Sequence, residues 1–251
     1  MKPEYPSAGH IHPLTALWQE AFGDSEDFIR LFFSTAYSPD RCRVILEGGD
    51  PVAALYWLDV ISRGQKMAYI YAVATHPACQ GRGLCRRLME DTHSLLQSHG
   101  YSAALLVPGE PGLRNMYTKM GYKNCGGIQT ISCAATEPPA PIRRISREEY
   151  AQLRRKYLPE GGVIQEGENL TYLETFSKLY AGEDFLLIAA SAKDHLNGIE
   201  LLGNTAAAPG ILTALGYASG SFRTPGEAPF AMFHPLTADA RIPAYFGLAM
   251  D

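Results

Sequence analysis

The sequence lacks several features that would place the protein on a membrane or on nucleic acid. No uninterrupted apolar run is long enough to cross a bilayer, and the amino-terminal stretch MKPEYPSAG has no apolar segment typical of a secretory signal. The formal net charge is −4, whereas binding to nucleic acid or to anionic lipid requires a basic surface. We therefore expect a cytoplasmic protein with neither a nucleic-acid partner nor a membrane partner.

Disulfides and metal sites are also disfavoured by the sequence. The five cysteines are an odd number and include no Cys-x-x-Cys pair, so free thiols are favoured over disulfides or zinc. His10 and His12 lie two residues apart without a third ligand near them, and we expect no metal. Cys85 precedes a predicted helix, a position that can make a thiol nucleophilic. A small packing residue is the favoured interpretation of Cys85.

Two common phosphate-binding loops are absent. A Walker loop needs Gly, four residues and then Gly-Lys-Ser/Thr, and a dinucleotide-binding fingerprint needs three glycines and a later acid. Residues 68–91 instead read as an apolar strand, a proline, a glycine-rich turn and an amphipathic helix. Gly81 and Gly83 would let backbone amides approach phosphate oxygens, and the helix that starts near Leu84 would direct its positive end to the same place.

The charges around this turn agree with an external anion. A helix start by itself favours acidic residues, but here the first acid is Glu90 and three arginines precede it, namely Arg82, Arg86 and Arg87. A bound pyrophosphate would explain this inversion.

The segment from Gln80 to Cys85 resembles the Gln/Arg-x-x-Gly-x-Gly/Ala signature of the GNAT superfamily of acyl-CoA-dependent N-acyltransferases. A second motif follows at the expected separation. Residues 105–107 read as a short strand, and the later segment LRNMYTKMGY resembles the helix and Tyr-x-x-x-Gly-Phe/Tyr ending of the superfamily's other signature. The order of the two motifs and their flanking strands fit the family.

The resemblance implies acetyl-CoA as the acyl donor and assigns the site residues. The strand at residues 67–75 would separate from the strand at residues 102–107, and main-chain groups near Val73 and Thr75 would pair with the pantetheine arm. Tyr117 would be the general acid that protonates the CoA thiolate. The pyrophosphate contacts would come from Gln80, Gly81, Arg82, Gly83, Leu84 and Cys85.

The general base stays open at this stage. Many relatives have a Glu on the strand that here spans residues 67–75, where this sequence offers only Tyr69 and Tyr71. Glu110, Asp59 and the carboxylates of Asp251 are alternatives, and water can also relay the proton.

Periodicity predicts alternating helices and strands, including an antiparallel meander. The family resemblance implies the GNAT fold, an α/β (α+β) fold with a mixed, mostly antiparallel sheet flanked by helices. In the first half the predicted helices are 11–22, one after Asp24, and 84–98, and the predicted strands are 42–47, 52–61, 67–75 and 102–107. In the second half we predict a strand at 142–145, helices at 147–157 and near 170–180, and a hairpin from 185 to 202 that turns near Asp194.

The proline-rich stretch Ala134 to Pro141 predicts a linker between two domains, residues 1–136 and 137–251. The segment PGILTALGY, which ends at Tyr217, echoes the PGLRNMYTKMGY segment of the first half, with Leu212 where the first half has Tyr117. No glycine loop accompanies it. We therefore expect a catalytic GNAT domain followed by a smaller, degenerate GNAT-like domain.

The sequence thus predicts a cytoplasmic N-acetyltransferase that moves an acetyl group from acetyl-CoA to an amine of a small molecule or a peptide. Whether the protein forms a homo-oligomer is left open. The alternative function is a CoA-binding sensor or interaction protein with little turnover. The missing strand Glu favours the alternative, and the intact Tyr117 favours the enzyme.

Overall fold

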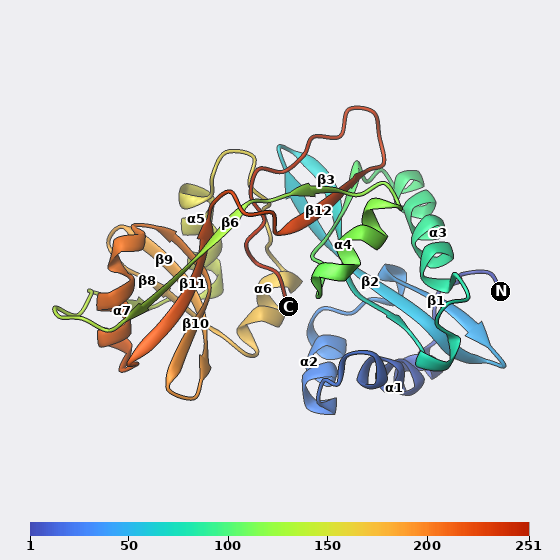
Figure 1. The fold of residues 1–251 in the computed structure, drawn as a ribbon, viewed down its shortest axis with the longest axis horizontal. Coiled ribbons are helices and arrows are strands. Elements are labelled where there is room, and N and C mark those ends of the chain that lie inside the picture. The colour runs from blue at the N-terminus through green and yellow to red at the C-terminus, as the bar shows by residue number, and fades with distance from the viewer. Residues whose placement is uncertain (251) are drawn as a thin grey trace. The chain divides into compact units, whose positions relative to one another are not determined.

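The computed structural model describes residues 1–250. They form two six-stranded mixed sheets with flanking helices (Figure 1), so the predicted α/β class is confirmed. The strand orders are β1-β2-β3-β4-β12-β5 and β6-β11-β10-β9-β8-β7. The chain divides into two compact units, one made of residues 1–123 and 233–241 and the other of residues 124–232 and those from 242 on.

The first unit begins with two helices and a three-stranded meander, as predicted. Its helices are α1 (Ile11–Phe22), α2 (Glu26–Thr35), α3 (Leu84–Ser98) and α4 (Pro111–Thr118). Its sheet contains β1 (Cys42–Glu47), β2 (Asp50–Ser62), β3 (Gln65–Thr75), β4 (Ala103–Leu106), β5 (Lys123–Cys125) and β12 (Ala231–Pro235). No helix within residues 1–250 is long and apolar enough to span a membrane.

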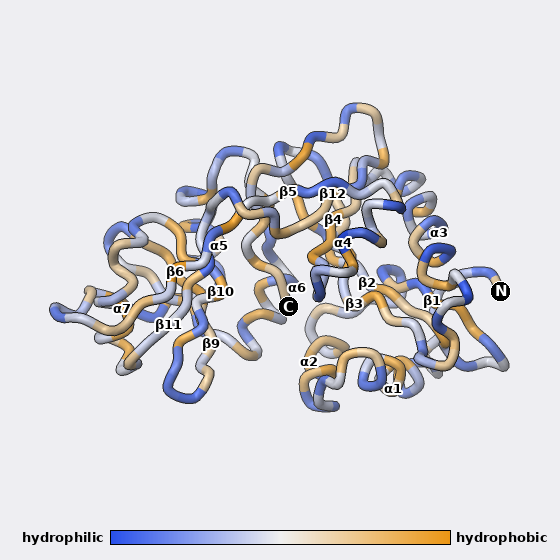
Figure 2. Tube along the Cα trace, viewed as in Figure 1, coloured by the Kyte–Doolittle hydropathy of each residue, from blue (hydrophilic) through white to orange (hydrophobic). Residues whose placement is uncertain are grey.

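The two amino-terminal helices bury aromatic side chains against the sheet. Trp18 and Phe32 are 2% and 1% exposed, and both rings contact Tyr56 of β2, with centroids 5.4 and 5.2 Å away. The cap of α2 is Ser25, whose hydroxyl accepts the Phe28 N–H. The preceding residue, Asp24, accepts the Trp18 indole N–H at 2.8 Å. Figure 2 shows hydrophobic stretches along β3 and β4 and hydrophilic residues at the exposed turns.

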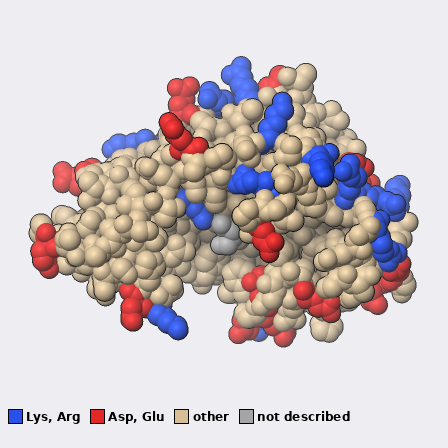
Figure 3. Space-filling model, viewed as in Figure 1, with Lys and Arg blue, Asp and Glu red and all other residues tan. Residues whose placement is uncertain are grey.

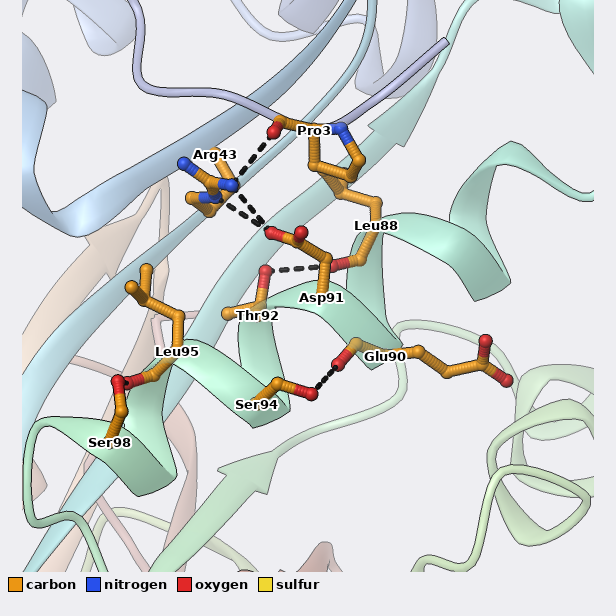
Figure 4. A network of polar contacts seen from close by, with 9 residues as sticks. All are labelled: Pro3, Arg43, Leu88, Glu90, Asp91, Thr92, Ser94, Leu95 and Ser98. Atoms are coloured by element: carbon orange, nitrogen blue, oxygen red, sulfur yellow. Dashed lines mark hydrogen bonds and ion pairs between the residues drawn. The ribbon is translucent and has the colours of Figure 1, made fainter.

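Helix α3 is tied to the edge of the sheet by one buried arginine. Arg43 of β1 donates to Asp91 Oδ2 at 2.6 and 3.0 Å and to the Pro3 carbonyl at 2.8 Å (Figure 4). Because the Arg43 side chain is 9% exposed, this pair is shielded from solvent and constrains α3 more than a surface pair would. Hydroxyl groups of α3 bond back to carbonyls of the same helix, as Thr92 does to Leu88.

The first sheet is completed by a strand from the far end of the chain. β12 lies beside β4, and the Leu236 N–H that follows it donates to the Ser102 carbonyl at 2.8 Å. β6 (Ile128–Ala134), on the other hand, belongs to the second sheet. The units therefore differ from the division expected between residues 136 and 137, because hydrophobicity along the chain does not reveal which sheet a short strand joins.

The second unit has the remaining elements. They are β6, β7 (Arg143–Arg144), α5 (Arg147–Tyr157), α6 (Glu168–Glu174), β8 (Lys178–Ala181), β9 (Phe185–Ala192), β10 (His195–Gly203), α7 (Ala208–Leu215) and β11 (Ser219–Pro225). The helix predicted near 170–180 is wrong over its second half, where β8 pairs with β9. The hairpin predicted from 185 to 202 is confirmed.

The second unit repeats the order of helices and strands of the first unit. The elements that correspond are not those that the similarity of the two Gly-Tyr segments had suggested. After α5 and α6 come three antiparallel strands, then α7, then β11 parallel to β10. In the first unit α3 connects the parallel strands β3 and β4 in the same way. Helix α7 thus has the place of α3, and the alignment of its Gly-Tyr end with that of α4 is wrong.

The predicted linker is packed rather than extended. The Thr136 N–H donates to the Pro209 carbonyl at 3.3 Å and the Ala140 N–H to the Gly210 carbonyl at 2.9 Å, both in the first turn of α7. A Cβ at Gly210 would lie 2.9 Å from the Pro138 carbonyl oxygen. The proline-rich stretch therefore covers the start of α7, whereas the start of α3 is open.

A buried ion pair joins the helices of the second unit to its sheet. Arg154 of α5 donates to both carboxylate oxygens of Glu200 at 2.7 and 2.9 Å and to the Val163 carbonyl at 2.8 Å. The Tyr150 hydroxyl also donates to Glu200. Removal of one partner of such a pair leaves a buried charge, which typically costs about 3–5 kcal/mol. Residues 245–250 are buried, and within residues 1–250 they form one isolated bridge, between Tyr245 and Gly162.

The place of β12 leads to a first prediction. Residues 1–136 alone should not unfold cooperatively, because they expose the edge of β4 and lose Phe233 and Leu236, which are 2% and 8% exposed. Residues 1–123 joined to 231–241 by a flexible linker of about 10 residues should regain a cooperative transition. Thermal circular dichroism of both fragments compares them. A cooperative transition of 1–136 at the temperature of the joined fragment would contradict this role of β12.

Candidate active site

The glycine loop leads from β3 into α3 with both glycines in the left-handed region. Gly81 has φ 75° and Gly83, the residue before the helix, has φ 73°. A Cβ at either position would meet no atom within 4 Å, so the backbone conformation and not lack of space requires glycine. No side chain caps α3, and its first turn contains no acid. The first N–H groups of α3 are therefore available to an anion.

The arginines near this loop have partners of their own. Arg82 donates to both oxygens of Glu47 at 2.7 and 3.1 Å and holds the pKa of that carboxyl below its usual value. Arg87 donates to the Met1 carbonyl at 3.0 Å, and Arg86 lies 3.9 Å from Glu90. All three guanidinium groups are exposed. The inverted charge pattern at the helix start is thus partly balanced within the protein.

The two strands beside the loop separate after a short parallel pairing. β3 pairs with β4 only at Met67, Ala68 and Tyr69. Beyond them β3 continues through Val73 to Thr75 without a strand partner on that side. The separation that the family resemblance implied is therefore present.

β3 also contains a bulge at the predicted pantetheine contacts. Between the pairs Tyr56↔Tyr71 and Ala54↔Ala74, β2 has one residue and β3 has two, Ala72 and Val73. Ala72 has φ 47°, a left-handed conformation that costs an L-residue roughly 1–2 kcal/mol. The bulge takes the main chain at Val73 out of the regular ladder. Strain of this kind is found where backbone groups serve a ligand. The Thr75 carbonyl accepts a long 3.5 Å hydrogen bond from Gln80 Nε2.

Tyr117 lies in the last turn of α4, the helix that follows β4. Because β3 and β4 are parallel, their carboxyl ends meet at one edge of the sheet, and both the glycine loop and α4 begin from that edge. The ring of Tyr117 is 6% exposed. Burial, and to a smaller extent the Cys85 thiol, raises the pKa of Tyr117 well above its usual value. The hydroxyl is therefore protonated at neutral pH and has a proton to donate.

Tyr122, which contacts Tyr117, forms a buried cluster with two histidines that the sequence motifs did not predict. The Tyr122 ring packs edge-on against Tyr117 at 5.7 Å, and its hydroxyl is 2.8 Å from His93 Nε2 of α3. His93 stacks on His234 of β12 with ring centroids 4.2 Å apart. A Cβ at Gly121 would lie 3.1 Å from the His234 ring. Tyr122 belongs to the second motif. The contact between His93 and His234 could not be foreseen from local spacing, because they are 141 residues apart in the sequence.

Burial keeps both of these histidines neutral. Desolvation, and then His234, lowers the pKa of His93 to about 3, and desolvation lowers the pKa of His234. Two stacked imidazolium rings would also repel each other. The cluster is therefore uncharged at neutral pH.

The candidate bases separate clearly in the structure. The Tyr101 hydroxyl donates to Asp59 at 2.5 Å and Lys66 lies 3.4 Å from it, so Asp59 is already engaged. Asp59 also pairs with Ala68, at the far end of β3 from Thr75. Glu110 is exposed and directly precedes α4, at the edge that the loop shares. Asp251 lies outside the described residues.

Tyr69 and Tyr71 are packing residues of β3. Tyr69 is 2% exposed, and the Tyr71 ring contacts Trp18 and Phe32 at 5.6 and 5.5 Å. Cys85 is half-buried, and burial raises the pKa of its thiol, which disfavours a nucleophilic thiolate. No group of three or more metal-ligating side chains occurs within residues 1–250.

Residues 4–125 match the family model described as an acetyltransferase (GNAT) domain. The matched segment contains the glycine loop, the bulge and Tyr117, and it ends with β5. This part of the chain is therefore similar to a GNAT acetyltransferase domain. No curated protein sequence matches the chain.

Solved structures with the same fold include two that are named GCN5-related N-acetyltransferases. A GCN5-related N-acetyltransferase from Kribbella flavida matches with a TM-score of 0.69 and 18% identity, over 94% of this chain and 72% of that one. One from Anabaena variabilis matches with a TM-score of 0.70 and 16% identity, over 94% and 73%. Eis1 from Mycobacterium abscessus matches with a TM-score of 0.67 and 12% identity, over 95% and 75%. At these identities the likeness establishes a GNAT-like fold.

The neutral histidine cluster predicts how stability depends on pH. The pKa of His93 is about 3 in the folded state and about 6.5 when unfolded, so between these values the unfolded chain binds the additional proton. The free energy of unfolding should fall as the pH is lowered from 7 to 4, with His93 contributing up to about 1.4 kcal/mol per pH unit. Urea unfolding at several pH values measures it.

The variant His93→Gln should have a shallower pH dependence than the wild type, because glutamine does not titrate. His99→Gln is the matched control, since His99 is exposed at the end of the same helix. Parallel pH profiles for wild type and His93→Gln would refute the assignment of a neutral buried His93.

Proposed function

We propose that this protein is an acyl-CoA-dependent N-acyltransferase that moves the acetyl group of acetyl-CoA to a primary amine. One observation carries the proposal. The open start of α3, the strained bulge at Ala72 and Val73, and a protonated Tyr117 all belong to the edge where the parallel strands β3 and β4 end. A CoA thioester needs a phosphate cradle, a backbone donor for its carbonyl and a proton for its leaving group, in that order along one ligand.

The pyrophosphate would bind at the loop from Gln80 to Cys85. The N–H groups of Gly81, Gly83, Leu84 and Cys85 and the positive end of α3 would contact its oxygens. The Arg82–Glu47 pair supports this role, because both side chains are over 40% exposed. Such a surface pair contributes little to stability, so Arg82 can exchange Glu47 for a phosphate at little cost.

The pantetheine arm and the thioester would lie between β3 and β4. Main-chain groups at Val73 and Thr75 would pair with the arm, and a backbone N–H at the bulge would stabilise the oxyanion. The neutral amine attacks the carbonyl carbon, and the C–S bond breaks as the tetrahedral intermediate collapses. Tyr117 then transfers its proton to the thiolate, so that CoA leaves as the thiol.

The proton that the amine loses needs an acceptor as well. Glu110 is our candidate for this role, directly or through a water, because it precedes α4 at the shared edge and is exposed. Asp59 is a poor alternative because Tyr101 and Lys66 already bind it. The amine belongs to a small molecule or a peptide. Trp18 and Phe32 are core residues and are therefore poor candidates for the walls of an acceptor pocket.

The second unit would be a degenerate copy that does not bind CoA. The observations that support this are its repeated order of elements, the absence of a glycine loop before α7, and the proline-rich stretch packed on the first turn of α7. The Pro138 carbonyl oxygen lies next to Gly210, and Pro209 has no N–H, so the first turn of α7 is less suited to an anion than that of α3. In the proposed division the first unit is catalytic.

The charge of the protein bears on which partners it can bind. On the face in Figure 3, basic side chains gather toward the upper right and many acidic side chains lie along the lower edge. The formal net charge of −4 disfavours nucleic acid or an anionic membrane as a partner. We propose a cytoplasmic enzyme with a small-molecule or peptide amine as its acceptor, and a homo-oligomer is compatible with this activity.

A CoA-binding sensor is the second candidate function. The observation that favours it is the lack of a carboxylate on β3, where Tyr69 and Tyr71 are packed. A screen of polyamines, aminoglycosides, amino acids and peptides for thiol release from acetyl-CoA separates the two. Binding of acetyl-CoA without thiol release for any amine would favour the sensor.

The phosphate loop is tested by Gly83→Glu, which should abolish the micromolar binding expected for acetyl-CoA. The variant places an anion at the proposed pyrophosphate contact. Gly100→Glu is the matched control, since Gly100 follows the other end of α3, has φ 77° and is equally open. Calorimetry measures both. Unchanged affinity in folded Gly83→Glu would remove the phosphate-loop assignment.

The general acid is tested by Tyr117→Phe, which should lower kcat about 10²-fold or more and leave the affinity for acetyl-CoA nearly unchanged. The hydroxyl is needed only as the thiolate leaves. Tyr157→Phe, which also removes one hydroxyl, should keep normal turnover because Tyr157 bonds only to the Glu183 carbonyl in the second unit. Wild-type kcat for Tyr117→Phe, with chemistry rate-limiting, would make Tyr117 a packing residue.

A further inference from the structure

The second unit contains a hollow of about 370 Å³ on its sheet that the proposed acyl transfer does not use. It lies where β10 and β11 begin, since Leu196 and Tyr217 line it and β11 starts at Ser219. An acyl-CoA site related to that of the first unit would lie at the opposite ends of these parallel strands. The hollow is therefore not a remnant of a CoA site. The residues that matter are Arg144, Lys178, Tyr180, Ser191, Leu196 and Tyr217.

Among the described residues, Arg144 and Lys178 at this hollow lack the ion-pair partners that other arginines of the unit have. Four other arginines of the second unit each form an ion pair, Arg143 with Glu149, Arg147 with Glu174, Arg154 with Glu200 and Arg155 with Glu166. Arg144 and Lys178 form none within residues 1–250. The one carboxylate that lines the hollow, Glu174, lies 3.2 Å from Arg147. The hollow therefore has two unneutralised positive charges.

The strand register brings these charges beside two tyrosines. Arg144 of β7 lies directly opposite Tyr180 of β8, and Lys178 is on the same face of β8 as Tyr180. Burial and the neighbouring Tyr217 raise the pKa of Tyr180, while Arg144 opposes them. The Tyr217 hydroxyl is hydrogen-bonded to Ser191. Leu196 and Ala189 supply an apolar floor.

We propose that this hollow is a binding site for a small aromatic carboxylate. The carboxylate would lie between Arg144 and Lys178 and accept hydrogen bonds from them, and the apolar ring would pack against Tyr180, Tyr217 and Leu196. Charged hydrogen bonds and aromatic contacts are the interactions that orient ligands in sites of this size. The site is independent of acyl transfer and lies within the second unit alone.

The test uses the full chain and 3-phenylpropanoate as the probe, with binding followed by calorimetry and by NMR line shifts. We expect saturable binding that weakens at high ionic strength. Arg144→Gln and Lys178→Gln should each lower the affinity about 10-fold or more, which is the usual effect of losing a charged hydrogen bond. The neutral amide of the same acid should bind at least about 10-fold more weakly, for the same reason.

Arg143→Gln is the matched control, because Arg143 is the next residue of the same strand but is paired with Glu149, and it should bind the probe like the wild type. All of these side chains are exposed, so the variants should fold, and circular dichroism checks it. Three outcomes overturn the proposal: no saturation below about 10 mM, equal binding of acid and amide, or wild-type affinity in Arg144→Gln.

Discussion

The short parallel pairing of β3 with β4 is the constraint on which the first unit depends. Pairing at Met67, Ala68 and Tyr69 fixes the two strands side by side and leaves the rest of β3 without a partner on that side. A parallel pair needs a crossover helix, and α3 supplies it. The glycine loop therefore starts where β3 ends, and α4 with Tyr117 starts where β4 ends, so that both reach the same edge of the sheet.

Neutral buried groups and exposed ion pairs have different parts in this unit. His93, His234 and Tyr122 hold the turn after α4 without any charge, since burial lowers the pKa of both histidines and raises that of the tyrosine. The Arg82–Glu47 pair beside the loop is solvent-exposed and therefore exchangeable. Uncharged, buried contacts thus surround Tyr117, whereas the charged side chains of the glycine loop are exposed to solvent.

The second unit has a similar order of elements, but its buried polar contacts include an ion pair instead of a neutral histidine cluster. It contains the buried Arg154–Glu200 ion pair. Glu200 also accepts a hydrogen bond from the Tyr150 hydroxyl, and Arg154 also donates one to the Val163 carbonyl. The proline-rich stretch packs on the first turn of α7, where it donates to the Pro209 and Gly210 carbonyls, and Pro209 itself has no N–H to offer. Arg144 and Lys178, which form no ion pair within residues 1–250, lie elsewhere in this unit, beside Tyr180.

The sequence by itself determined the local elements and the motif register. α1, β1, α3 and α5 have the predicted bounds, because each combines a clear apolar period with a glycine, a cap or a charge at its end, and the two motifs placed the glycine loop and Tyr117. Only the tertiary structure decided that β12 completes the first sheet, that α7 takes the place of α3, and that His93 meets His234. Strand partners and buried polar contacts join residues far apart in the chain, and local spacing carries no information about such pairs.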